Sequence, residues 1–217
     1  MRYLLCLLAL AGLGLSVPAP ARAVTYETCT KAEQAEIAAA ASGAMEMAQA
    51  AAAAVRDDDT FARWFGRYSD RNAETVRRNL KAVHDAISLD EINVRCINEG
   101  FEGCKDGTYA YVFREEHYHV HLCPSFRLLP AMFDFDAADP RMENGTREGT
   151  IIHELSHFVV IAGTDDHCYA RGPCSDMARR DPFSAIRNAD SYQYFAEDVG
   201  FFPVMHLVLS PTGRARR

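Results

Sequence analysis

Beyond residue 23 the sequence lacks both a long hydrophobic run and an excess of positive charge. None of its later apolar stretches approaches the roughly 20 residues that a membrane-spanning helix requires. Residues 24–217 hold 21 basic and 30 acidic residues, a net charge of −9 with histidine neutral. This charge argues against nucleic acid or an anionic membrane as partner and suits a basic substrate. Internal repeats and linkers are also lacking, and we therefore expect a single domain.

The apolar run that is present lies at the N-terminus. Arg2 is followed by the apolar stretch Tyr3–Val17, and Ala21-Arg22-Ala23 forms a small-x-small cleavage site. This pattern predicts a secretory signal peptide over residues 1–23, with a retained anchor as the alternative. We accordingly expect a secreted protein without a membrane anchor, or a periplasmic one in a Gram-negative source.

Six cysteines remain after residue 23, an even number that indicates disulfides in an exported protein. Six cysteines allow 15 pairings, so their number alone does not give the connectivity. They are Cys29, Cys96, Cys104, Cys123, Cys168 and Cys174.

The N-terminal third is predicted to be helical. Residues 31–55 are rich in alanine, the best helix former, and Thr30 with Glu33 forms a capping-box pattern. A second helix is expected over 61–87, where apolar residues recur at helical spacing.

The middle of the chain changes period. Residues 109–113 and 117–122 are rich in aromatic and β-branched residues, which predicts strands of a small antiparallel sheet. Helices are expected over 147–162, ending at Gly163, and over 185–198. The expected fold class is α+β.

One motif carries chemistry: His153, Glu154 and His157 form H-E-x-x-H within the predicted helix 147–162. Residues four apart lie on one helix face, so both imidazoles can bind one zinc ion. Glu154 lies beside them and can take a proton from an activated water molecule. The motif thus predicts a zinc-dependent hydrolase.

A catalytic zinc site needs a third protein ligand. The extended motif that ends in a third histidine is excluded, because Val160 and Gly163 occupy its glycine and histidine positions. Several candidates stay open on the residues alone: Asp165, Asp166, His167 and, from the last helix, Glu197.

The segment "HELSHF" followed by "GTDDHCYA" resembles the signature of the aspzincin metallopeptidases, the deuterolysin and peptidyl-Lys metalloendopeptidase group. Four further segments are similar to the peptidyl-Lys branch: residues 25–42, "WFG" at 64–66, "GTYAYVF" at 107–113 and "NADSYQYFAED" at 188–198. The resemblance covers essentially the whole chain after residue 23. It implies a zincin-like fold with N-terminal helices, an active-site helix and a C-terminal helix.

The resemblance also implies roles for particular residues. Asp166 falls on the third zinc ligand, Tyr169 on the tyrosine that stabilises the oxyanion, and Asp190 on the aspartate that pairs with the substrate lysine in the S1′ pocket. Ala170 departs from the family, which has glycine there. The implied activity is that of a monomeric endopeptidase with one zinc ion that cleaves on the amino side of lysine.

The same resemblance implies the disulfides Cys29–Cys96 and Cys104–Cys123. Cys168 and Cys174 lie outside the family's pattern, but they are six residues apart and can close a small loop beside Tyr169. His117, His119 and His121 alternate along a predicted strand and form a candidate second metal site, although the family has no ligands there. A broader-specificity protease and a secreted binding protein or toxin on the same fold are the alternative functions.

Overall fold

The structure is a computed structural model that describes residues 24–209 except 90–91, 99, 101, 106 and 133–139. The predicted signal peptide lies outside the described residues. The elements along the chain are β1 (Thr25–Glu27), α1 (Lys31–Ala54), α2 (Asp59–Phe65), α3 (Asp70–Leu89), β2 (Asn93–Cys96), η1 (Glu102–Cys104), β3 (Ala110–Val112), β4 (His119–Leu122), η2 (Pro124–Leu128), η4 (Pro140–Asn144), α4 (Arg147–His157), α5 (Arg171–Arg180), α6 (Pro182–Ala185) and α7 (Ala189–Leu209).

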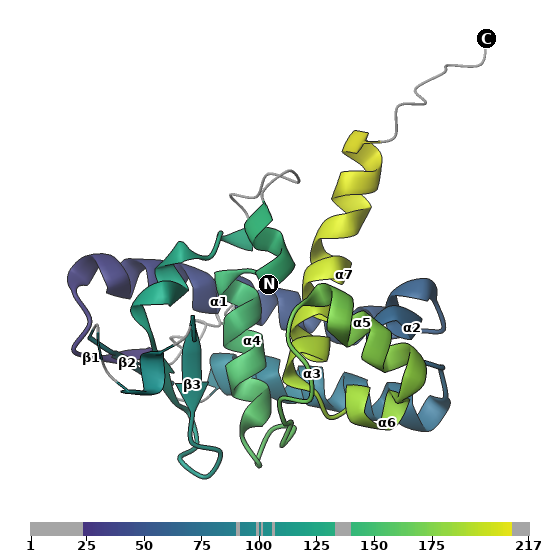
Figure 1. The fold of residues 1–217 in the computed structure, drawn as a ribbon, viewed down its shortest axis with the longest axis horizontal. Helices are drawn as coiled ribbons and strands as arrows, with labels where there is room; N and C mark the ends of the chain where they lie inside the picture. The colour runs from purple at the N-terminus through teal and green to yellow at the C-terminus, as the bar shows by residue number, and fades with distance from the viewer. Residues whose placement is uncertain are drawn as a thin grey trace, which may run out of the picture.

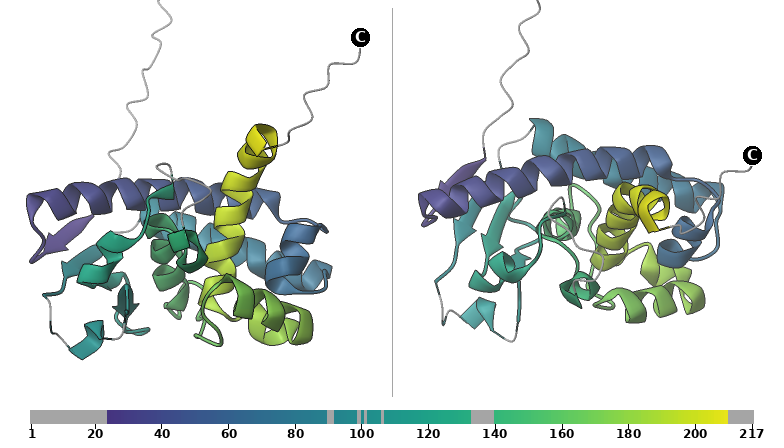
Figure 2. Two further views of the ribbon diagram at one scale, coloured as in Figure 1. Left: turned by 45° about the horizontal axis from the view of Figure 1, so that its top comes forward. Right: turned by 90° about the horizontal axis from the view of Figure 1, so that it is seen from above.

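The predicted α+β class is confirmed. A small sheet occupies one side of the molecule, and helices α2, α5 and α6 occupy the other, with α4 between them (Figure 1). Helix α1 runs along the body and spans both parts (Figure 2), packing against α3, α4 and α7.

The sheet is mixed rather than purely antiparallel, which corrects the prediction. Its strand order is β1-β2-β4-β3, and only β3 and β4 pair antiparallel, as a hairpin. Strands β1 and β2 pair in parallel, as do β2 and β4. Helices α1 to α3 lie between β1 and β2 in the chain, and such a crossover allows parallel pairing. Strand β3 lies at the edge.

Helix α1 follows the prediction, including a complete capping box between Thr30 and Glu33. The expected helix 61–87 is instead two helices, α2 and α3, separated at Gly66. Gly66 has a φ of 74°, and a Cβ atom there would collide with the Ala178 carbonyl and the Pro182 ring. The glycine is therefore required where the chain breaks.

The C-terminal helices also differ from the predictions. Helix α4 ends at His157 instead of residue 162, because the chain turns at Phe158, whose carbonyl accepts the N–H groups of Ile161, Ala162 and Gly163. Helix α5 was not predicted, and α7 begins at Ala189 instead of 185.

Three disulfides join Cys29 to Cys96, Cys104 to Cys123, and Cys168 to Cys174. The first ties the ends of β1 and β2, and the third brackets Tyr169 and Ala170.

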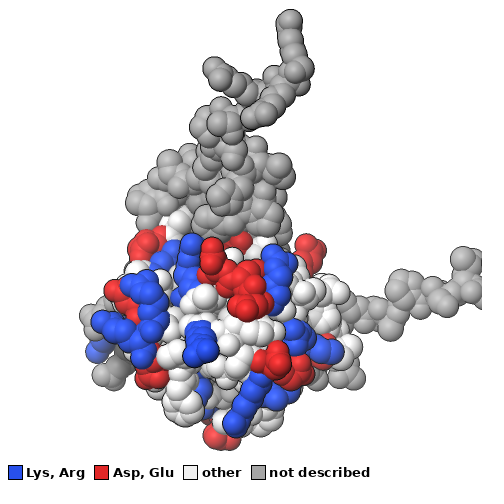
Figure 3. Space-filling model, turned by 90° about the vertical axis from the view of Figure 1, so that its right-hand side faces the viewer, with Lys and Arg blue, Asp and Glu red and all other residues white. Residues whose placement is uncertain are grey.

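On the face that lies to the right in Figure 1, cationic side chains (blue) and acidic side chains (red) are interspersed (Figure 3). None of the described helices is both long enough and apolar enough to cross a membrane.

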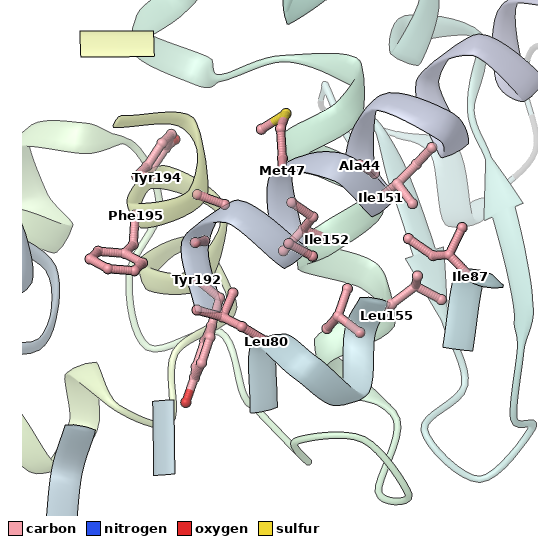
Figure 4. Close-up of a cluster of buried hydrophobic side chains, with 14 of the residues drawn as sticks. Ala44, Met47, Leu80, Ile87, Ile151, Ile152, Leu155, Tyr192, Tyr194 and Phe195 are labelled. Carbon is pink, nitrogen blue, oxygen red and sulfur yellow. The ribbon is translucent and has the colours of Figure 1, made fainter. Parts of the chain in front are cut away.

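Side chains from α1, α3, α4 and α7 meet in the part of the core that Figure 4 shows, and residues of α2 and of the sheet belong to the same cluster. Ile152 and Leu155 of α4 are fully buried there. Burying a large aliphatic side chain contributes about 1.5–3 kcal/mol, so this packing fixes the position of α4.

Candidate metal centre

Helix α4 carries the H-E-x-x-H motif, and its beginning is fixed by a side-chain cap. The Thr146 hydroxyl accepts a hydrogen bond from Gly149 N at 2.9 Å and donates to Oε1 of Glu197 at 2.9 Å. Gly149 lies so close to Glu197 and Gln193 of α7 that a Cβ atom would not fit. The close contact explains a glycine inside this helix, where it otherwise costs about 1 kcal/mol.

After α4 the chain folds back onto the helix that it has just left. The Thr164 N–H donates to Ser156 O at 3.1 Å, and the two hydroxyl groups of Thr164 and Ser156 are 2.7 Å apart. This return places Asp166 beside the last turn of α4.

Three side chains meet there: His153, His157 and Asp166. The Nε2 atoms of the histidines are 3.1 Å apart, and Oδ1 of Asp166 lies 3.3 and 3.4 Å from them. Tetrahedral zinc with bonds of about 2.0–2.1 Å requires ligand atoms about 3.3–3.4 Å apart. The donor set therefore fits zinc in both chemistry and spacing.

Both imidazoles are oriented by a partner on Nδ1. Nδ1 of His153 lies 2.7 Å from Oδ1 of Asp190, and Nδ1 of His157 lies 2.9 Å from the Thr164 carbonyl. Both partners accept a proton, so each Nδ1 carries the hydrogen and each Nε2 presents its lone pair. Such outer partners fix ligand rings in metal sites.

The surroundings of Asp166 favour the charged form of its carboxyl group. Burial acts to raise the pKa of Asp166, but hydrogen bonds and positive charge from His153 and His157, when these imidazoles are protonated on both nitrogens, hold that pKa well below its usual range. The carboxylate is therefore ionised at neutral pH.

Glu154 and Tyr169 flank the donors. Glu154 is 4% exposed, and burial raises the pKa of its carboxyl, with the two histidines acting in the opposite direction. Burial and the neighbouring Asp166 carboxylate raise the pKa of the Tyr169 phenol. Tyr169 is thus protonated and able to donate a hydrogen bond.

The group opens into a cavity of about 610 Å³. One wall is the segment Gly107–Val112, which includes edge strand β3. The cavity is also lined by Thr150, Asp190, Gln193 and Tyr194, and by Tyr169 and Ala170.

The structure distinguishes between the four candidates for the third zinc ligand. Asp165 bonds to Arg114 and lies 3.7 Å from Arg187, and His167 lies 4.0 Å from Asp165. Glu197 is buried against Thr146 and Arg171. Of these candidates, only Asp166 joins the two histidines.

The strand histidines do not form a second group of metal ligands within the described part of the chain. His121 stacks on Tyr111 with ring centroids 4.7 Å apart, whereas His117 contacts Phe158 and precedes β4.

Sequence reasoning missed three features of this centre. They are the contact between Asp190 and His153, the Thr164 carbonyl, and the cavity-lining residues Thr150, Gln193 and Tyr194. Asp190 and His153 are 37 residues apart, so no local spacing relates them.

Comparison with known proteins shows which family this chain belongs to. Residues 50–197 match the family model of the aspzincins, described as lysine-specific metallo-endopeptidase. The chain belongs to the aspzincin family.

The chain is also similar to individual proteases. Over 138 residues, 64% of the chain, it is 36% identical to an extracellular protease of Aeromonas hydrophila. It is 33% identical over 139 residues to the peptidyl-Lys metalloendopeptidase of Pleurotus ostreatus. The matches span 35% of the first relative and 73% of the second.

A zinc peptidase from Grifola frondosa has the same fold, with a TM-score of 0.67 and 26% identity. The match covers 80% of this chain and 99% of that one.

Proposed function

We propose that this protein is a secreted zinc metalloendopeptidase that cleaves peptide bonds on the amino side of lysine. The observation that carries the proposal is the triangle of donor atoms from His153, His157 and Asp166 beside Glu154, in a chain of the aspzincin family. Secretion is supported by the signal-peptide pattern and by the extracellular relative in Aeromonas. Peptides and proteins are its partners, and it acts as a monomer.

The three donors would hold one zinc ion, which when bound supplies Lewis-acid activation of a water molecule and of the scissile carbonyl. Glu154 takes a proton from the attacking water and delivers it to the leaving amine. The Tyr169 phenol donates a hydrogen bond to the oxygen that becomes negatively charged.

The substrate backbone is bound along β3. Among the described strands, β3 pairs only with β4 and forms the edge of the sheet, and it lines the cavity. An extended peptide can add to such an edge through main-chain hydrogen bonds.

Asp190 provides the preference for lysine. Its Oδ1 bonds to His153 and its Oδ2 accepts the Ala170 N–H at 2.9 Å, yet the side chain also lines the cavity. A carboxylate has about four acceptor positions, so it can bind an ammonium group as well. An uncharged substrate side chain gains nothing from this negative charge, which favours a cationic side chain such as that of lysine.

The main test is digestion of a denatured protein by the zinc-loaded protein, with cut sites read by mass spectrometry. We expect cuts before lysine, and Glu154→Gln should abolish them. Glu148→Gln is the matched control, because Glu148 is buried in the same helix but bonds to Met132 N outside the cavity. No cleavage, or full activity of E154Q, would refute the proposed reaction.

A second experiment separates the two contacts of Asp190. Asp190→Asn should lower kcat/KM for lysine substrates more than for substrates with norleucine in that position. An equal loss for both would show that Asp190 acts only through His153, in favour of a broader-specificity protease.

A further inference from the structure

The segment Arg187–Asp190 lies beside the loop that carries Asp166 and is hydrogen-bonded to it. Asp165 N donates to Arg187 O at 2.7 Å, and Ala189 N donates to Asp165 O at 3.1 Å. These bonds form a parallel bridge between Asp165 and Asn188. The loop is therefore fixed immediately before Asp166.

The Asn188 side chain fixes the loop immediately after Asp166. Its Oδ1 accepts the N–H groups of His167 at 2.8 Å and Cys168 at 3.1 Å. Its Nδ2 faces Ser191 Oγ at 3.4 Å and Cys174 Sγ at 3.8 Å. Asn188 is 0% exposed, so its amide is held in one orientation by contacts at both ends.

Asp166 depends on such support more than the other two donors. The histidines belong to a packed helix and each has a partner on Nδ1. Asp166 lies in a loop, and its side chain is 33% exposed. Backbone anchors on both sides hold the loop so that its carboxylate lies beside the imidazoles.

We propose that Asn188 is the positioning residue for Asp166 and thereby sets the affinity for the metal ion. The inference rests on the proposed zinc site. When the competent loop conformation is populated only in part, the dissociation constant rises by the inverse of that fraction. Loss of an outer partner typically weakens metal binding about 10- to 100-fold.

The test measures zinc dissociation constants by chelator competition, together with melting temperatures. Asn188→Ala should weaken zinc binding about 10- to 100-fold. Asn188→Asp keeps an acceptor for both N–H groups and should stay within about threefold of the original protein, since two donors stabilise the introduced carboxylate.

Asn79→Ala is the matched control. Asn79 is also buried, but it lies on α3 and not at the metal centre. Its amide donates a hydrogen bond to the Tyr192 hydroxyl at 2.8 Å. This variant should lower the melting temperature but leave zinc affinity unchanged.

Three outcomes would overturn the inference: unchanged zinc affinity in folded N188A, an equal loss in N79A, or a tenfold loss in N188D. Should N188A fail to fold, N188D and N79A still decide. Failure of the original protein to bind zinc would instead refute the proposed function.

Discussion

At the residue scale, Ala170 has a backbone conformation that belongs to glycine. Its φ of 67° and ψ of 157° lie in a region that costs other residues about 1–3 kcal/mol. The strain persists because the Ala170 N–H is bound to Asp190 and the Cys168–Cys174 disulfide brackets the turn. The alanine therefore keeps the conformation that the family's glycine allows.

Ala170→Gly should stabilise the protein. Relief of strain exceeds the roughly 0.5–1 kcal/mol that glycine costs through its freedom in the unfolded chain. We expect a gain of about 1 kcal/mol, or a rise of about 2–4 °C in melting temperature. Ala178→Gly inside helix α5 should have the opposite effect, and a lower melting temperature for A170G would show that Ala170 is unstrained.

Tyr169→Phe tests the proposed oxyanion donor. Tyr169 is 63% exposed, so the loss of its hydroxyl should leave stability unchanged. We expect kcat to fall about 10²- to 10³-fold, with KM and zinc affinity within twofold. Tyr111→Phe is the control, since Tyr111 lines the same cavity but stacks on His121. Equal kcat losses in both variants would contradict the assignment.

The three candidate metal ligands could be predicted from the sequence to different degrees. The i, i+4 spacing of His153 and His157 is a local property of a helix, so the sequence alone indicates it. The choice between Asp165 and Asp166 depends on a loop conformation set by Arg187 and Asn188, which lie more than 20 residues away. Only the family resemblance pointed to Asp166.

At the scale of elements, the N-terminus of α4 can be tested through Thr146. Thr146→Ala removes the cap and one donor to buried Glu197, at a cost of about 1–2 kcal/mol. The melting temperature should fall by about 2–8 °C in thermal unfolding. Thr146→Ser keeps the hydroxyl and should retain most of the stability; equal losses in both variants would exclude the cap as the cause.

The elements themselves were predicted where local signals are strong. Helix α1 has alanine and a capping box, and both operate within a few residues. Helix α5 contains Gly172 and Pro173, and its N-cap residue Ala170 makes no side-chain cap, so it has no recognisable start. The parallel pairing of β1 with β2 joins residues 68 positions apart, which no periodicity reveals.

At the scale of the whole molecule, the chain contains three lysines but 20 arginines. Lys31 opens helix α1, Lys81 lies inside α3, and Lys105 directly follows Cys104, which is tied to Cys123. A protease that binds extended peptides cannot use a bond inside an intact helix such as the one before Lys81. The capping box at Thr30 and the Cys104–Cys123 disulfide restrain the bonds before Lys31 and Lys105. A lysine-specific endopeptidase of this sequence should therefore resist its own activity.

Arg56→Lys should remove that resistance. Arg56 lies in a bend between α1 and α2, with its side chain 73% exposed, and exposed loops are the preferred sites of proteolytic nicking. We expect concentrated zinc-loaded R56K to cut the peptide bond that follows Val55, while the original protein stays intact. The products should be separated on a reducing gel, because the Cys29–Cys96 disulfide would otherwise hold the two fragments together.

Arg179→Lys, in helix α5 with its side chain 65% exposed, is the matched control and should stay uncut. A free peptide of residues 50–62 that carries the same R56K substitution supplies the reference: if the peptide is cut and the R56K protein is not, lysine scarcity does not protect the chain.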